Sequence, residues 1–366
     1  MYNLIKPLIF KMDAEKAHKL TIKALKSSPF IPTAKEDDPI LKTSLWDRSF
    51  PNPIGLAAGF DKNAEVITPM LKMGFGFVEV GTVTPKLQEG NPTPRIFRCP
   101  EHKAVINRMG FPSEGVGIFK ENLEKFLSQK PRPSGIVGLN IGMNKTQEEP
   151  AKDYRALVRM LAPMADYLTV NISSPNTPGL RNLQEKGAFL DLMGQILEER
   201  NKSCGKFPPP LLVKLAPDLT EQQQQELAEA SLEAGIDGLI LTNTTLDRPD
   251  FLPDDFKNQM GGLSGKPLTE KSTNVIGNFY RLTDGKIPLI GAGGVSTGAD
   301  AYAKIRAGAS LVQVYTGMIY EGPQIAQKIN KELTELLKKD GFSSISDAIG
   351  VDIKANSVQN KEKASA

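Results

Sequence analysis

The sequence predicts an α/β protein: a closed barrel of parallel strands and intervening helices, preceded by a short amphipathic helical segment. Short apolar runs rich in Val, Ile, Leu and Phe recur from Asn52 onward. A polar loop and a stretch with helical periodicity follow each run. Because such runs are apolar on both faces, we expect parallel strands covered by helices. Eight of these units favour a (β/α)8 TIM barrel over the alternative, a doubly wound open sheet.

The expected strands can be placed one by one. In chain order they are Ile54–Gly59, Phe77–Thr82, Ile136–Gly142, Tyr167–Ser173, Leu211–Ala216, Gly238–Asn243, Pro288–Gly293 and Leu311–Thr316. Pro112 begins a helix that runs towards Lys130, and cap-type residues at 218–221 and 297–300 precede two further helices. Gly308 is the expected stop of the last of these helices.

The first thirty residues differ in character from the barrel. Apolar residues recur at helical spacing before and after Asp13, a plausible N-cap. The polar faces carry six lysines: Lys6, Lys11, Lys16, Lys19, Lys23 and Lys26. This pattern indicates a pair of amphipathic helices. The pair is expected either to lie on an anionic membrane surface or to dock on the barrel with its lysine face in water.

The expected domain organisation follows from these patterns. Residues 1–32 form the amphipathic helical segment, a candidate for membrane contact. Residues 33–340 form the barrel with its cofactor and substrate sites, and residues 341–366 form a polar, flexible C-terminal tail.

Composition excludes several classes of protein. A net charge of only +3 does not indicate a nucleic-acid-binding protein. Two distant cysteines, Cys99 and Cys204, argue against a disulfide framework, and two histidines, His18 and His102, argue against a histidine-based metal site, so no metal is expected. No apolar run approaches the roughly 20 residues that span a bilayer, and no secretory signal is present. We expect a protein of the cytosol or of a membrane surface.

The glycine-rich strand ends indicate a phosphate-bearing cofactor. Active sites in such barrels use the loops after the strands, and the last two strands usually supply a phosphate cradle. Gly294 and the pair Tyr315–Thr316 stand at these positions. A dinucleotide motif would need glycine where Ser296 stands, and a P-loop would need Ser or Thr where Pro267 stands. The pattern therefore favours a mononucleotide such as FMN, with tight turns as the alternative explanation of the glycines.

Carboxamide and ammonium groups gather at the same strand ends. Each carboxamide both donates and accepts hydrogen bonds, as a planar imide ring does. Five asparagines stand there: Asn107, Asn140, Asn171, Asn176 and Asn243. Lys62 could pair with a substrate carboxylate. Lys214, in a buried barrel top, needs an acceptor such as a reduced flavin. The alternatives are loop capping for a lone asparagine and a structural salt bridge for Lys214.

The segment Asn171–Leu180 (Asn-Ile-Ser-Ser-Pro-Asn-Thr-Pro-Gly-Leu) resembles dihydroorotate dehydrogenases. The resemblance covers residues 1 to 335, including Leu56–Lys62, Gly81–Pro85, Asn107–Phe111, Asn140–Gly142, Thr242–Arg248, Gly261–Pro267, Ile290–Gly294 and Leu311–Gly317. It is closest to the membrane-associated, quinone-dependent class 2. Ser174 stands where the soluble class has cysteine, and the amphipathic N-terminal extension is present.

The resemblance implies a cofactor, a substrate and a site. FMN would contact Ala58, Gly59, Phe60, Asp61, Lys62, Thr82, Asn140, Asn171, Lys214, Thr242, Gly265, Gly294, Tyr315 and Thr316. Dihydroorotate would contact Lys62, Asn107, Arg108, Met109, Gly110, Phe111, Asn171, Asn176, Asn243 and Thr244. Ser174 would take the C5 proton while the C6 hydride passes to the flavin. Orotate would result, in the fourth step of de novo pyrimidine biosynthesis.

The resemblance also implies the electron acceptor and the location. Ubiquinone or menaquinone would enter through the N-terminal helices near His18, and the protein would be peripheral on the cytoplasmic face of the bacterial inner membrane. Because a serine hydroxyl is a weak base by itself, we expect a relay from Ser174 to water, with Thr177 as a candidate member and Phe111 closing the site. Two alternatives are a soluble FMN barrel oxidoreductase and a non-catalytic membrane-surface protein.

Overall fold

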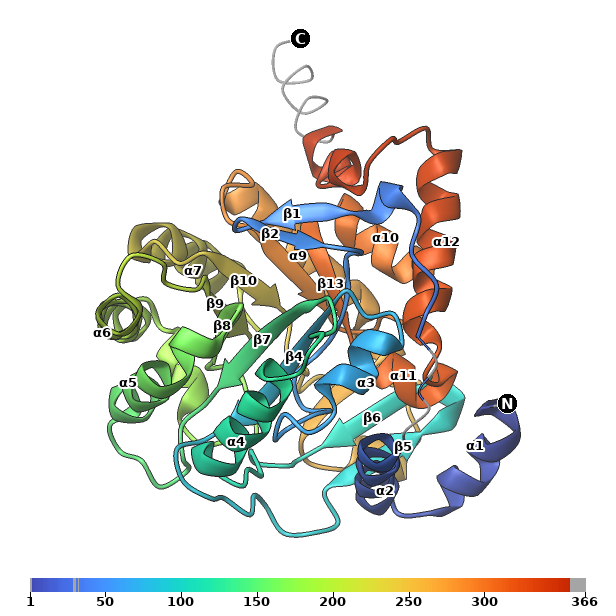
Figure 1. The fold of residues 1–366 in the computed structure, drawn as a ribbon, viewed down its shortest axis with the longest axis horizontal. Helices are drawn as coiled ribbons and strands as arrows, with labels where there is room; N and C mark the ends of the chain where they lie inside the picture. The colour runs from blue at the N-terminus through green and yellow to red at the C-terminus, as the bar shows by residue number, and fades with distance from the viewer. Residues whose placement is uncertain (1, 29–30, 32, 356–366) are drawn as a thin grey trace.

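The computed structural model describes residues 2–28, 31 and 33–355, and its centre is a closed barrel with the strand order β10-β12-β13-β3-β4-β7-β8-β9 (Figure 1). All neighbouring barrel strands pair in parallel. The strands are β3 (Ile54–Leu56), β4 (Phe77–Val83), β7 (Ile136–Ile141), β8 (Tyr167–Asn171), β9 (Leu211–Leu215), β10 (Gly238–Leu241), β12 (Leu289–Ala292) and β13 (Ala309–Val314). The predicted (β/α)8 barrel is confirmed, each strand lies where it was expected, and the open-sheet alternative is wrong.

Helices surround the barrel and bury its outer face (Figure 1). They are α3 (Ile67–Lys72), α4 (Val116–Leu127), α5 (Pro150–Leu161), α6 (Lys186–Cys204), α7 (Glu221–Ala234), α9 (Thr269–Leu282), α10 (Gly298–Arg306) and α12 (Ile325–Lys339), with the short α8 (Asp254–Lys257) and α11 (Thr316–Glu321). The 3₁₀ turns are η1 (Pro39–Leu41), η2 (Pro100–His102), η3 (Ala162–Met164), η4 (Leu180–Gln184), η5 (Lys266–Leu268) and η6 (Ile345–Ala348).

The helix starts follow local capping. Thr220 and Thr297 each form a capping box, as the cap-type residues around them predicted. Gly308 has a φ of 123° and follows the end of α10, as expected of a stop residue. The helix expected from Pro112 begins later, at Val116, because Gly115 precedes it with a φ of 84° that is incompatible with a helical turn.

One end of the barrel is plugged by aromatic side chains. The hairpin of β1 (Thr43–Leu45) and β2 (Arg48–Phe50) places Phe50 against Phe77, with ring centroids 5.7 Å apart. Trp46 packs on Tyr167 beside them. This second apolar core fills the amino-terminal end of the strands, so open space for a ligand must lie at their carboxyl ends.

A small antiparallel sheet with the order β11-β6-β5 lies over the carboxyl ends of the barrel strands. Its strands are β5 (Ile96–Cys99), β6 (Ala104–Asn107) and β11 (Gly262–Gly265). The helices α1 (Tyr2–Lys11) and α2 (Ala14–Ser27) lie beside this sheet in Figure 1, and α2 packs against β5. Asp13 caps α2 by accepting from the Lys16 amide, as predicted.

The N-terminal helices are docked on the barrel, and their outward faces remain available for contact with a membrane surface. Arg95 Nε and Nη2 donate to the two carboxylate oxygens of Glu15, at 2.8 and 2.7 Å, in a buried pair. Lys6 does not belong to the exposed lysine face, because its ammonium donates to the Tyr320 carbonyl at 2.9 Å. The other five lysines of these helices are exposed. Within the described residues, no helix has the length and apolar composition needed to cross a membrane.

The expected flexible tail is wrong for residues 341–355. Ile345 and Ala348 are fully buried, because they complete the apolar layer under α10 and α12. Asp352 pairs with Arg306 at 2.6 Å. Residues 356–366 lie outside the described residues, as does Pro32, the expected end of the N-terminal segment.

Candidate active site

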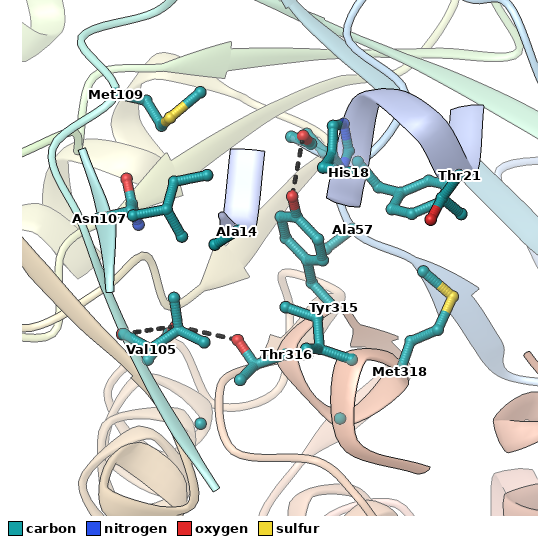
Figure 2. Close-up of a pocket in the computed structure, with 18 of the residues that line it drawn as sticks. Ala14, His18, Thr21, Ala57, Val105, Asn107, Met109, Tyr315, Thr316 and Met318 are labelled. Carbon is teal, nitrogen blue, oxygen red and sulfur yellow. Dashed lines mark hydrogen bonds between the residues drawn. The ribbon is translucent and has the colours of Figure 1, made fainter. Parts of the chain in front are cut away.

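One continuous cavity of about 800 Å³ runs from the N-terminal helices to the carboxyl ends of the barrel strands. Figure 2 shows side chains from three distant parts of the chain around it: His18 from α2, Asn107 from β6, and Tyr315 from the loop after β13. Its helix end is lined mainly by apolar side chains and its barrel end mainly by polar ones. A single space therefore has two chemically different halves.

Most of the sequence-predicted site residues line this cavity. They are Ala58, Gly59, Phe60, Lys62, Thr82, Asn107, Met109, Gly110, Phe111, Asn171, Ser174, Asn176, Lys214, Thr242, Asn243, Thr244, Gly265, Gly294, Tyr315 and Thr316. Three predicted residues are not among the lining residues: Asp61, Arg108 and Asn140.

Local hydrogen bonding explains where two of these three side chains lie. The buried Asp61 carboxylate accepts the amides of Glu65 and Val66, both at 2.8 Å, and burial raises its pKa to about 6. The Arg108 guanidinium stacks on Phe97 and donates to the side chain of Gln259 at 3.2 Å. Both side chains thus stabilise loops around the cavity.

Asn140 belongs to a buried hydrogen-bond chain that underlies the cavity. Its carbonyl oxygen accepts from Thr82 Oγ1 at 2.6 Å and from Asn171 Nδ2 at 3.2 Å. Its own amide donates to Glu79 at 2.7 Å. Because Thr82, Asn140 and Asn171 end three neighbouring strands, these bonds fix the orientation of the side chains that do face the cavity.

Glu79 is a buried carboxylate that sequence reasoning missed. It lies fully buried in β4 and also accepts from Tyr167 Oη at 3.0 Å, Thr169 Oγ1 at 3.2 Å and Gln313 Nε2 at 2.8 Å. The available signal was a single acidic residue within an otherwise apolar strand, which is unusual unless the charge is compensated.

Lys214 is a buried ammonium group at the same level of the barrel. Its side chain lines the cavity, and the residue is only 7% exposed. Among the described residues, none accepts a hydrogen bond from Nζ or forms an ion pair with it. Burial lowers its pKa, and the charge of Glu79 opposes that shift. The alternative of a structural salt bridge is therefore not seen in the described part of the chain.

These unpaired groups fit a planar, polar ring. Gln313 Oε1 is buried without a hydrogen-bond partner among the described residues, and Gln313 lines the cavity as Lys214 does. A buried donor and a buried acceptor without partners are costly unless a ligand satisfies them. The pyrimidine edge of a flavin offers acceptors and a donor in one plane, so this part of the site suits the expected cofactor.

Two glycines at the expected phosphate position, Gly265 and Gly294, are also required by the local backbone conformation. Gly265 and Gly294 have φ values of 94° and 73°. A Cβ at Gly265 would lie 2.1 Å from the Lys103 carbonyl oxygen, and one at Gly294 would lie 2.1 Å from Thr269 Oγ1. The turn explanation therefore applies to both glycines. Both also line the cavity, so the two explanations are compatible.

The asparagines of the loops converge around Ser174. Asn176 Nδ2 donates to the Asn107 carbonyl at 3.2 Å, and Asn243 Nδ2 donates to Ser173 Oγ at 2.9 Å. Ser174 Oγ accepts from the Asn176 amide at 3.2 Å. Among the described residues no imidazole or carboxylate bonds to this hydroxyl, and Thr177, although buried, does not bond to it either.

Lys62 places a second ammonium group beside the barrel end. Its Nζ donates to the Gly59 carbonyl at 2.7 Å, which also accepts from Tyr315 Oη at 3.1 Å. Burial lowers the pKa of Lys62 to about 8. The amine is charged at neutral pH and has donors left for an anionic ligand.

The helix end of the cavity is largely apolar, with a few polar residues. His18 packs edge-on against Phe60 at 5.2 Å, and burial, together with the charge of Lys62, lowers its pKa to about 3. Arg98, which sequence reasoning missed, lies over the Phe10 ring at 4.7 Å and donates to the Met12 carbonyl. The exposure of strand β5 does not alternate, so no pattern in this strand pointed to Arg98.

Comparison with known proteins gives consistent matches over nearly the whole chain. The family model "Dihydroorotate dehydrogenase" matches residues 40–337. The chain is 49% identical over 351 residues to a "Dihydroorotate dehydrogenase (quinone)" of Rhodospirillum rubrum, covering 96% of this chain and 94% of the relative. It is 48% identical over 345 residues to the mitochondrial protein of that name in Mus musculus, covering 93% and 87%.

A solved structure is similar over the same extent. A dihydroorotate dehydrogenase of Eimeria tenella, in complex with ferulenol, superposes with a TM-score of 0.89 at 42% sequence identity. The match covers 93% of this chain and 96% of that one.

Proposed function

The chain belongs to the dihydroorotate dehydrogenase family, and from that premise we propose that it oxidises (S)-dihydroorotate to orotate and passes the electrons to a quinone. The reaction serves de novo pyrimidine biosynthesis. The observation that carries the proposal is the single cavity with a polar barrel end and an apolar helix end. A polar, charged substrate and an apolar acceptor can use the two ends without sharing one pocket.

The proposed cofactor is flavin mononucleotide, a finer assignment than the flavin dependence of the family. Lys214, Asn171 and Thr82 would face the ring, and the loops at Gly265, Gly294 and Thr316 would hold the phosphate. When bound, FMN takes a hydride from the substrate and supplies electrons to the quinone. Asp61 and Asn140 would act from behind the cavity, through the loop and the hydrogen-bond chain that they stabilise.

Dihydroorotate would bind between the asparagine-bearing loops and Lys62. The carboxamides of Asn107, Asn176 and Asn243 can donate to and accept from the amide groups of its ring. The Lys62 ammonium would pair with its carboxylate. Phe111, in the loop after β6, would cover the bound ring and exclude water. Met109, Gly110 and Thr244 line the same space, and Arg108 would only hold the loop.

Ser174 is the proposed proton acceptor. The C5–H bond of the substrate breaks, an O–H bond forms at Ser174 Oγ, and the proton that this oxygen carried leaves through a relay to water. Because Ser174 Oγ accepts from the Asn176 amide, its own proton is free to be donated onward. A serine needs such a relay because it is a weak base.

The helix end is the proposed entrance for ubiquinone or menaquinone from a membrane. Leu4, Leu8 and Leu20 are 80%, 65% and 54% exposed on α1 and α2, and exposed lysines flank them. Apolar side chains bordered by lysines favour contact with an anionic lipid surface. We place this contact on the cytoplasmic face of a bacterial inner membrane.

The test is anaerobic mixing of the purified protein with L-dihydroorotate. The flavin absorbance should bleach, and a quinone added afterwards should restore it. A colourless protein that does not take up FMN would overturn the proposal. A preference for fumarate or NAD over quinones would instead favour the soluble class of enzyme.

A further inference from the structure

Lys304 is a lysine that the proposed reaction does not use and that has no exposed surface. It lies on α10 behind the loop at Gly293–Val295, outside the cavity. Its Nζ donates to the Thr269 carbonyl at 3.3 Å, to Ser272 Oγ at 3.1 Å and to Thr273 Oγ1 at 3.0 Å. All three acceptors belong to the first turns of α9, so the lysine joins α10 to the start of α9.

The charge of Lys304 has no nearby counter-charge among the described residues. Its three acceptors are neutral, and the nearest acid, Asp300, is occupied in capping α10, where it accepts the amides of Ser296 and Thr297 at 2.9 Å. Burial lowers the pKa of Lys304 to about 7. A buried cation without a counter-ion is costly, so its retention suggests an anion close by when the site is filled.

The hydrogen bonds that Lys304 donates determine where its acceptors, the hydroxyls of Ser272 and Thr273, direct their own protons. In its charged form the lysine only donates, so both hydroxyls then accept from it and direct their own protons elsewhere. Ser272 Oγ donates to the Ala292 carbonyl at 2.6 Å, and Thr273 Oγ1 donates to the Thr269 carbonyl at 2.8 Å. Thr269 Oγ1, which does not bond to Lys304, lies 2.9 Å from the carbonyl oxygens of both Lys266 and Gly294 and can donate its one proton to either. The Ala292 carbonyl is therefore held toward α9 through Ser272, and the Gly294 carbonyl lies against the first residue of α9.

The opposite side of each of these peptides faces the cavity. In a trans peptide the N–H points away from the C=O of the same plane. Holding the Ala292 and Gly294 carbonyls toward α9 turns the amides of Gly293 and Val295 away from it, and both residues line the cavity. Among the described residues, nothing accepts from either amide. Two free N–H groups on one loop form a binding surface for an anion.

We propose that Lys304 is a positioning residue for the cofactor phosphate: through α9 it holds the Gly293–Val295 loop with its amides toward the cavity, and it adds a buried positive charge behind them. This inference rests on the proposed FMN cofactor. Gly291 leaves room beside this lysine, because a Cβ there would lie 3.0 Å from Ile276 Cδ1 and 3.2 Å from Lys304 Cδ.

The test separates the phosphate from the ring. The full chain, stripped of flavin, is titrated with FMN and with riboflavin, which lacks the phosphate, and flavin fluorescence gives the two dissociation constants. Lys304→Met keeps the volume and removes the charge. It should weaken FMN binding about tenfold to a hundredfold and riboflavin binding less than about twofold. Lys214→Met is the matched control, because that lysine faces the ring: it should weaken both flavins alike.

The outcomes are distinguishable. If Lys304→Met weakens both flavins equally, or neither, Lys304 acts only in packing and the inference is overturned. If the unmodified chain binds neither flavin, the proposed function itself fails. Should Lys304→Met not fold, as circular dichroism would show, Ser272→Ala gives the same test: it breaks the link to the Ala292 carbonyl, and a selective loss of FMN affinity is again expected. Equal FMN and riboflavin losses in Ser272→Ala would overturn the inference as well.

Discussion

The two ends of the cavity are held in place in different ways. At the barrel end, Glu79, Asn140, Thr82 and Asn171 form one continuous hydrogen-bond chain across neighbouring strands. At the helix end, α1 and α2 are attached by a few separate contacts, of which the Glu15–Arg95 pair is the most buried. The barrel strands thus hold the end proposed for chemistry. The end proposed for quinone access depends on the contacts of α1 and α2, which substitutions can weaken without changing the barrel. Substitutions at the two ends should change different steps.

The largest effect is expected at the barrel end. Ser174→Ala removes the proposed proton acceptor, so the anaerobic rate of flavin reduction by dihydroorotate should fall about 10²- to 10⁴-fold. Ser174→Cys should retain more activity than alanine, because a thiol ionises more readily. Stopped-flow absorbance measures the rate. If the alanine variant is reduced at a near-normal rate, Ser174 is not the proton acceptor. If its quinone KM changes as strongly as its rate of flavin reduction, the two ends of the cavity do not act on separate steps.

The same division explains how much could be predicted from the sequence. Apolar strand runs fix the barrel and place every strand end at one mouth, so Asn171, Lys214 and Gly294 were predicted to meet and do line one cavity. Side-chain direction in the loops was not predictable, because it depends on which local amides are free. Asp61 bonds to the amides of Glu65 and Val66 instead of facing the ligand space.

Buried charges and the C-terminal segment were missed for a related reason. Glu79 and Lys304 form hydrogen bonds to neutral groups far away in the sequence, such as Gln313 and Ser272, which only the closed barrel brings near. Residues 341–366 were interpreted together as one polar tail, although the part up to residue 355 carries Phe342, Ile345, Ile349, Val351 and Ile353. The packing of residues 341–355 depends on a few apolar contacts, of which Ile345 is an example.

At the helix end, the buried ion pair should matter more than an exposed one. Arg95 lowers the pKa of Glu15 to about 2 by hydrogen bonding. Arg95→Met would leave the Glu15 carboxylate buried without its main partner and loosen α2, so the quinone KM should rise about tenfold or more, with little change in flavin reduction by dihydroorotate.

The matched control for this pair is Lys26→Met. Lys26 pairs with Glu65 at 2.6 Å, also from α2, but its side chain is largely exposed. Its loss should change the quinone KM less than about twofold. Steady-state kinetics with a soluble quinone measures both variants. Equal effects of the two substitutions would show that burial does not decide how α2 is attached.

At the barrel end, the pH dependence of orotate binding tests the role of Lys62. Only the charged form of Lys62 can pair with a carboxylate, and its pKa of about 8 in the free protein means that this form is lost as the pH rises through that value. The dissociation constant of orotate should be constant below pH 8 and rise about tenfold per unit above it. Orotate binding is measured by the change in flavin absorbance. Because no turnover takes place, proton transfer at Ser174 does not contribute to the pH profile. In Lys62→Arg the rise should disappear, because arginine stays charged, and a flat profile in the unmodified protein would exclude this role for Lys62.

The smallest effect is expected for membrane contact, which many side chains share. Leu8→Ser removes one exposed apolar side chain of α1, and binding to vesicles with anionic lipid should weaken about threefold to tenfold, because part of a leucine's transfer free energy is lost. Phe207→Ser is the matched control: Phe207 is 90% exposed, but it precedes β9 at the plugged end of the barrel. Vesicle sedimentation should therefore show a weakened Leu8 variant and an unchanged Phe207 variant. If Phe207→Ser weakens binding as much as Leu8→Ser, exposed apolar area in general, and not the helix end of the cavity, governs the contact with lipid.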